Sequence, residues 1–87
     1  MTGRSSGTTS LATRVGTCIR DARLASGLSR HRVARSAGLT RRELASYEHG
    51  RSVPSGTDLR ALAGACGMSA EQMLPRDLAA ALADSSN

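Results

Sequence analysis

The chain contains neither phenylalanine nor tryptophan, and Tyr47 is its single aromatic residue. Its apolar core must therefore come from small and medium aliphatic side chains, which suits short helices packed closely together. The lack of aromatic residues also argues against a reader of single-stranded nucleic acid, because such proteins stack bases on aromatic platforms. A chain of 87 residues forms one domain at most and buries a modest core, so a roomy enclosed active site is not expected.

Lysine is absent as well, and all twelve basic residues are arginine. Residues 1–52 carry ten arginines and three acidic residues, a net charge of +7, whereas residues 53–87 carry two arginines and four acidic residues, a net charge of −2. The cationic first half favours a polyanionic partner. From charge alone, a solvated basic surface without such a partner is an equally good interpretation.

The sequence also lacks the patterns of several other protein classes. Cys18 and Cys66 are far apart and match no metal-ligand spacing, so no metal site is expected and two free thiols in a reducing cytoplasm are the default. No signal peptide and no apolar run near ~20 residues is present, which predicts a cytoplasmic protein without membrane contact. There is no Ser/His/Asp set, paired carboxylate cleft or glycine-rich phosphate loop, so we expect neither an enzyme nor a bound cofactor.

Hydrophobic periodicity predicts an all-α domain of five short helices with no strand and no internal repeat. Residues 1–10 are rich in Gly, Ser and Thr and predict a disordered N-terminal arm. Residues 11–75 form the helical domain, and residues 76–87 form a short C-terminal helix or tail. With their capping and terminating residues, the five helices occupy residues 11–27, 29–38, 40–50, 55–67 and 69–75.

Residues 29–50 have the organisation of a helix-turn-helix. Gly38 supplies a left-handed turn, Leu39 an apolar plug, and Thr40 the N-cap of the next helix. Thr40 and Glu43 have the spacing of a capping box, and Ala34 is small enough for a close helix crossing. In such a unit the second helix lies in the major groove of DNA, and its N-terminal residues meet the base edges.

Three stretches then resemble the Cro/cI-type (XRE) helix-turn-helix regulators, the lambda repressor-like domains: VGTCIRDARLASGLS, VARSAGLTRRELASYEHGRSVPS and LRALAGACGMSAEQMLP. The resemblance covers about Val15 to Pro75 and implies a five-helix, cytoplasmic, nucleoid-associated and usually dimeric regulator of transcription. One departure is Arg30, where the family commonly has glutamine after the serine that opens the second helix.

Helix 40–49 carries the predicted base contacts. Two arginines at its N-terminal end are locally unfavourable because the helix dipole is already positive there, so a negative partner is expected. The resemblance places Arg41 and Arg42 at base-reading positions, where an arginine can donate two hydrogen bonds to guanine. The full set of predicted base contacts is Arg41, Arg42, Ala45 and Ser46. The predicted phosphate contacts are Ser29, Arg30, Thr40, His49 and Arg51.

Other residues receive structural interpretations. Tyr47 and Cys66 are predicted to pack in the core, and Glu48 is predicted to fix an arginine in an ion pair. Surface positions or intramolecular pairs are expected for Arg14, Arg20, Arg23 and Arg35.

The sequence thus predicts a sequence-specific, DNA-binding transcription regulator that binds double-stranded DNA as a homodimer, with repression or activation left open. The alternative is a protein-interaction module, such as an antitoxin or an accessory transcription factor with a protein partner. Residues 69–83 are favoured as the dimer surface, because Leu78 and Leu82 need a partner.

Overall fold

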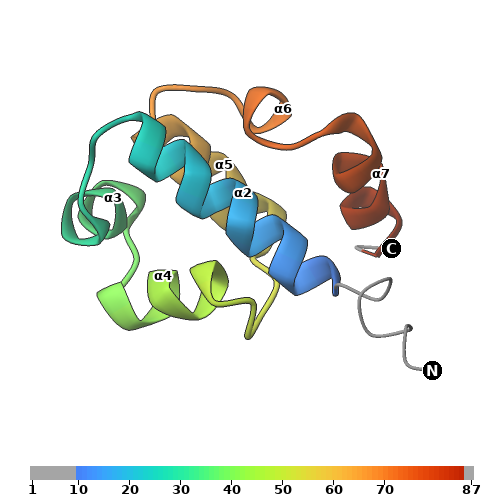
Figure 1. Ribbon diagram of the computed structural model, residues 1–87, viewed down its shortest axis with the longest axis horizontal. Helices are drawn as coiled ribbons and strands as arrows, with labels where there is room; N and C mark the ends of the chain where they lie inside the picture. Colours follow the sequence, from blue (N-terminus) through green and yellow to red (C-terminus); the bar gives the residue numbers. More distant parts are fainter. Residues whose placement is uncertain (1–9, 86–87) are drawn as a thin grey trace.

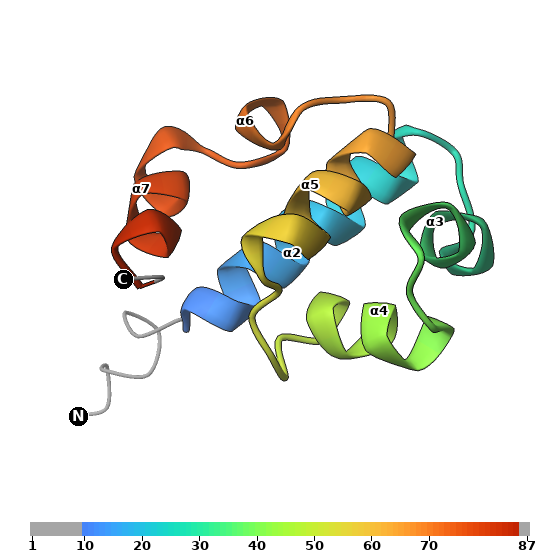
Figure 2. The same ribbon diagram turned by 180° about the vertical axis from the view of Figure 1, so that it is seen from behind.

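The computed structural model describes residues 10–85, and every regular element among them is an α-helix. Two of these helices, α2 and α5, run together through the middle of the molecule (Figure 1). The view from behind agrees that α3 and α4 lie to one side of them, with α6 and α7 on the other (Figure 2). The elements are α2 (Leu11–Ala25), α3 (Arg30–Ala37), α4 (Arg41–Glu48), α5 (Gly56–Ala65), α6 (Ala70–Met73) and α7 (Arg76–Ser85).

The predicted count of five helices is wrong, because the described residues contain six. The sixth is α7, in the segment left open as a helix or a tail. Its Leu78 is 1% exposed and belongs to the core, and the amide of Ala79 donates to the carbonyl of Pro75 at 2.9 Å. Leu78 therefore finds its apolar partners within its own chain, and the half-buried Leu82 packs against the same core. Of the predicted disordered arm, residues 1–9 lie outside the described residues.

Five of the six helices, α2 to α6, start at a serine or threonine cap. In each of these five a serine or threonine oxygen accepts the backbone N–H three residues further on, which satisfies one of the free donors of the first turn. The caps are Ser10, Ser29, Thr40, Ser55 and Ser69. Ser55 and Asp58 have capping-box spacing, but the Asp58 side chain accepts a hydrogen bond from Tyr47 instead of from the Ser55 backbone.

The core is aliphatic and continuous across all six helices. Val33 and Leu44 are fully buried where α3 meets α4, and Ala34 is 1% exposed at the same crossing, as the helix-turn-helix pattern predicted. Cys66 is buried in this core and Tyr47 packs against it, so both predicted core positions are confirmed. In the described part of the chain, no helix is both long and apolar enough to span a bilayer.

Two glycines let α2 approach the end of α4. A Cβ on Gly16 would overlap the carbonyl oxygen of Tyr47 and would lie 3.0 Å from that of Glu48. Gly50 has a φ of 74°, and a Cβ there would lie 2.7 Å from the hydroxyl oxygen of Thr13. The sequence pattern predicts Gly50 at the end of a helix and indicates no role for Gly16. The backbones of α2 and α4 are therefore in direct contact, which fixes the direction of α4.

Candidate nucleic-acid interface

The turn between α3 and α4 is closed by backbone and side-chain hydrogen bonds. Gly38 takes a φ of 76°, and the amide of Leu39 donates to the carbonyl of Ala34 at 2.8 Å. Thr40 and Glu43 then form both bonds of the predicted capping box: Glu43 N–H to Thr40 Oγ1 at 3.0 Å, and Thr40 N–H to Glu43 Oε1 at 2.8 Å. The first turn of α4 is therefore held in a defined position.

The N-terminal end of α4 is exposed and cationic. Arg41 and Arg42 are both exposed, and neither side chain forms an ion pair or hydrogen bond with any residue that the structure describes. Glu43 is the acidic residue nearest in sequence, and its Oε1 is already bonded to the Thr40 amide. Two guanidinium groups are thus available to an external anion or hydrogen-bond acceptor.

The remaining predicted DNA contacts differ in their accessibility. Ala45 and Ser46 are half-buried, and Ser46 also uses its carbonyl oxygen to accept the Arg51 amide at 2.9 Å. His49 is the exposed C-cap of α4, and the side chain of Arg51 is exposed in the loop that follows. Ser29 and Thr40 are exposed N-caps at the starts of α3 and α4.

Arg30 belongs to a buried charge cluster at the other end of α4. Glu48 has a completely buried side chain and accepts hydrogen bonds from two arginines. Arg23 on α2 donates Nε at 2.7 Å and Nη2 at 3.1 Å, while Arg30 on α3 donates Nε at 2.9 Å. The remaining Nη1 of Arg23 donates to the Leu28 carbonyl at 3.1 Å. The predicted ion pair of Glu48 is confirmed, and one carboxylate joins three helices.

The charges of this cluster are mutually stabilised. Burial alone would raise the pKa of the Glu48 carboxyl, but hydrogen bonds and charges from Arg23 and Arg30 outweigh that effect and leave its pKa below the ordinary value. The hydrogen bond to Glu48 raises the pKa of Arg23 in turn. Arg30 keeps a side chain that is 41% exposed, so its predicted phosphate contact would have to use the part of the guanidinium turned away from Glu48.

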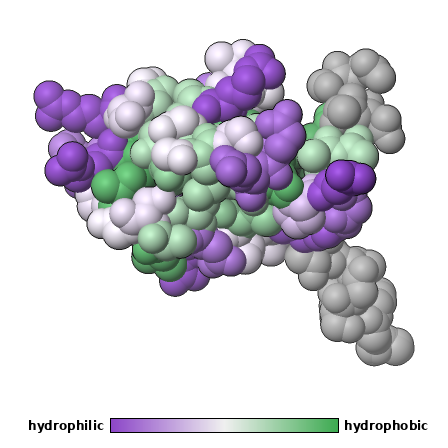
Figure 3. All heavy atoms as spheres, turned by 90° about the horizontal axis from the view of Figure 1, so that it is seen from above, coloured by the Kyte–Doolittle hydropathy of each residue, from purple (hydrophilic) through white to green (hydrophobic). Residues whose placement is uncertain are grey.

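The outer face of α3 is hollowed and also cationic. A hollow of about 280 Å³ is lined by His31, Ala34, Arg35, Leu39 and Arg41, so it joins α3 to the first residue of α4. A neighbouring hollow of about 570 Å³ is lined by His31, Arg32, Arg35 and Ser36. No acidic residue lines either hollow. Hydrophilic side chains accordingly project at the end of the molecule that carries α3, on the left of Figure 3.

A side-chain hydrogen bond also joins α4 to α5. The hydroxyl of Tyr47 donates to Asp58 Oδ2 at 2.7 Å. This hydrogen bond, together with burial and the negative charge of Asp58, raises the pKa of Tyr47 to about 12. The lone aromatic residue is therefore a structural link between α4 and α5, and its half-buried ring packs against the core.

Cysteines and metal-ligand clusters contribute nothing to this interface. Burial raises the pKa of both thiols, Cys18 and Cys66, which keeps them protonated and weakly nucleophilic. Among the described residues, no group of three or more His, Cys, Asp or Glu side chains is arranged to hold a metal ion.

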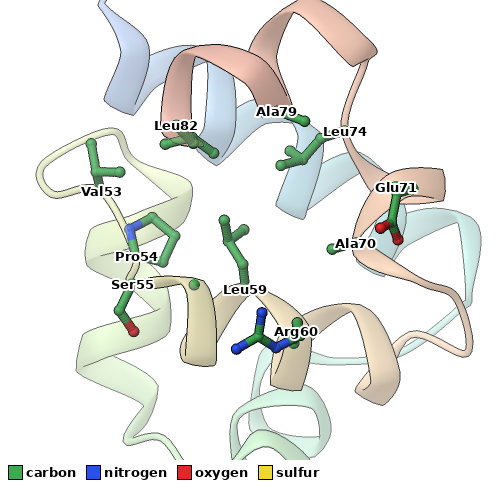
Figure 4. A pocket seen from close by; sticks show the side chains of 11 residues that line it. Val53, Pro54, Ser55, Leu59, Arg60, Ala70, Glu71, Leu74, Ala79 and Leu82 are labelled. Atoms are coloured by element: carbon green, nitrogen blue, oxygen red, sulfur yellow. The ribbon is translucent and has the colours of Figure 1, made fainter. Parts of the chain in front are cut away.

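An apolar groove lies away from the cationic surface. It has a volume of about 610 Å³ between α5, α6, α7 and the loop after α4 (Figure 4). Leu59, Leu74 and Leu82 point toward it, and Val53, 42% exposed, lies at its edge. Arg60 and Glu71 are charged residues of its lining.

Comparison with known proteins identifies the same unit. A family model described as a helix-turn-helix domain matches residues 14–82. No curated protein sequence matches the chain. Among solved structures, the clp gene regulator ClgR from Corynebacterium glutamicum has a TM-score of 0.74 at 23% identity, over 90% of this chain and 82% of that one.

Two further structures are similar at slightly higher identity. The restriction-modification controller protein C.AhdI from Aeromonas hydrophila has a TM-score of 0.69 at 27% identity, over 72% of this chain and 96% of that one. The hypothetical transcription factor NHTF from Neisseria has a TM-score of 0.68 at 27% identity, over 84% of this chain and 85% of that one. All three carry names of regulators or transcription factors.

Proposed function

The chain belongs to the helix-turn-helix domain family, as a DNA-binding transcription regulator of the XRE type, and we propose that it reads a specific DNA sequence with α4. The observation that carries this proposal is the N-terminal end of α4. Arg41 and Arg42 are exposed there and lack a carboxylate partner among the described residues, and they lie in the first turn of a capped helix. A rigid helix presenting unpaired guanidinium groups suits the major groove, where guanine offers two acceptors.

The contacts divide by what they would recognise. Arg42 would donate to guanine O6 and N7, and Ser46 and Ala45, one turn further along α4, would meet a base edge or a thymine methyl group. Backbone phosphates would be met by the helix caps and the flanking cations, which position the protein without reading sequence. These phosphate contacts are Ser29, Arg30, Thr40, His49 and Arg51.

Binding as a homodimer completes the proposal. Two copies would place one α4 each in successive major grooves, about 34 Å apart, so the preferred site would be roughly palindromic. The apolar groove beside α7 supports such pairing, since Leu82 and Val53 leave apolar surface uncovered there. The same groove would serve a protein partner if the chain acts as an accessory factor. A cytoplasmic, nucleoid-associated location follows from a DNA partner.

Selection from a random duplex library at fixed salt tests the function. The wild-type protein should enrich a palindromic site with G·C pairs under α4, and a partner-dependent factor should enrich no site by itself. Arg42→Ala should then lose about 1–3 kcal/mol of preference for the G·C pair while keeping its affinity for random duplex. Equal weakening on all sequences would contradict direct readout. Arg20→Ala, an exposed arginine on α2, is the control for loss of one positive charge.

A further inference from the structure

Three cationic or protonatable side chains converge on the smaller hollow of α3. His31 and Arg35 come from successive turns of one face of α3, and Arg41 comes from the first turn of α4. The apolar wall between them is Ala34 and Leu39, and the space measures about 280 Å³. None of the three has an ion-pair partner within residues 10–82.

Their arrangement contrasts with that of the two arginines that bind Glu48 in the same domain. Arg23 and Arg30 share the carboxylate of Glu48, so their proximity is compensated inside the protein. Arg35 and Arg41 line one hollow with no carboxylate in its wall. Like charges placed near one another repel, and a bound anion removes that cost.

We propose that this hollow is a phosphate site that holds one backbone phosphate of the bound duplex. The proposal rests on the proposed function, because α4 must enter the groove for the flanking backbone to come within reach. The proposal also gives the two arginines of α4 different roles. Arg41 binds the DNA backbone together with Arg35, and Arg42 is the arginine that reads bases. His31 contributes a third donor to the same phosphate.

The chemistry favours a phosphate of DNA over an acidic side chain of a partner protein. Guanidinium groups from two helices can donate several hydrogen bonds at once to the oxygens of one phosphate, which a planar guanidinium fork matches well. The hollow also adjoins the first residue of α4, so the phosphates that border the groove are the anions nearest to it.

Salt dependence of duplex binding tests the site. With the selected duplex and with a random duplex, Arg35→Ala should weaken binding by the same factor and reduce the slope of log affinity against log salt by up to roughly 0.9, the value for one phosphate. Arg41→Ala should behave in the same way. Arg35→Lys keeps the charge and should retain most of the slope. Thermal unfolding of each variant establishes that the domain remains folded.

The matched control is Arg20→Ala, which removes an equal charge from α2 outside the hollow and should leave the slope within experimental error. If the slope of log affinity against log salt for Arg35→Ala equals that for Arg20→Ala, the proposed phosphate site is wrong. A change in base preference for Arg41→Ala would also overturn the site, because it would make Arg41 a base reader. Failure of the proposed function looks different: the wild-type protein itself would then show no preference between the two duplexes.

Discussion

The two ends of α4 use arginine in opposite ways. At its C-terminal end, Glu48 is fully buried and binds Arg23 and Arg30 from two other helices. At its N-terminal end, Arg41 and Arg42 are exposed and have no such partner in the described part of the chain. The same side chain is thus a structural element where a carboxylate faces it, and a free donor where none does.

This difference separates orientation from recognition. The buried end fixes the helix through α2 and α3, where side-chain geometry is defined by packing. The exposed end can then present flexible, charged side chains without losing its direction. A base-reading helix needs both properties, since contacts to base edges depend on positions that a loosely held helix would not maintain.

The largest effect is expected from removing the negative charge of the buried end. Glu48→Gln leaves Arg23 buried without a counter-charge, and breaking a buried pair in this way typically costs about 3–5 kcal/mol. Urea unfolding followed by circular dichroism measures the change. Glu71→Gln, on an exposed residue of α6, is the control and should stay within about 0.5 kcal/mol of wild type.

The same variant should alter the response to acid. Because the pKa of Glu48 lies below its ordinary value of 4.5 in the folded protein, the stability it contributes is present above that pH and is lost as the pH falls through the lower, folded-state pKa. Glu48→Gln should lack this part of the acid dependence. An unchanged acid profile, or a cost no greater than that of the control, would mean that the cluster does not hold α4.

A smaller effect is expected where α2 touches the buried end. Gly16→Ala would force α2 away from the Tyr47 and Glu48 carbonyl groups, at a cost of about 1–3 kcal/mol. Gly64→Ala is the matched control, because it also lies inside a helix but nothing stands within 4 Å of its added Cβ. That control should gain about 0.5–1 kcal/mol from helix propensity. If both variants gain stability, the backbones of α2 and α4 are not in contact.

The features predicted correctly from the sequence are the local ones. Ser29 and Thr40 cap their helices, and Thr40 and Glu43 close the capping box, because these depend on residues three positions apart. The helix-turn-helix crossing at Ala34 follows from residue size, which the sequence also displays. The resemblance to XRE regulators supplied the order of these pieces, and the matching family model agrees with it.

The features that were missed depend on contacts across the chain. Gly16 looks like any helical glycine until α4 is placed against it. Arg30 was predicted to contact phosphate, and only the fold brings its Nε to Glu48, eighteen positions away. The sequence does not decide between a helix and a tail for α7, because its anchor, Leu78, could equally have served another chain. A signal for Gly16 exists in principle, since it is a glycine inside a helix, next to Val15 and three positions before Ile19, on the buried face of α2.

The smallest predicted effect has the opposite sign and concerns the exposed end. Replacing Arg41 and Arg42 together by alanine removes two cations from the positive end of the helix dipole, so the free protein should gain stability, by about 0.5 kcal/mol or less per arginine at low salt. Near 1 M salt, where the screening length is about 3 Å, the gain should vanish. Urea unfolding at both salt concentrations measures it. A loss of stability would instead show that the arginines make stabilising contacts in the free protein. A gain, accompanied by loss of duplex binding, would mean that this end of α4 is kept slightly unfavourable in the free protein because its partner is an anion.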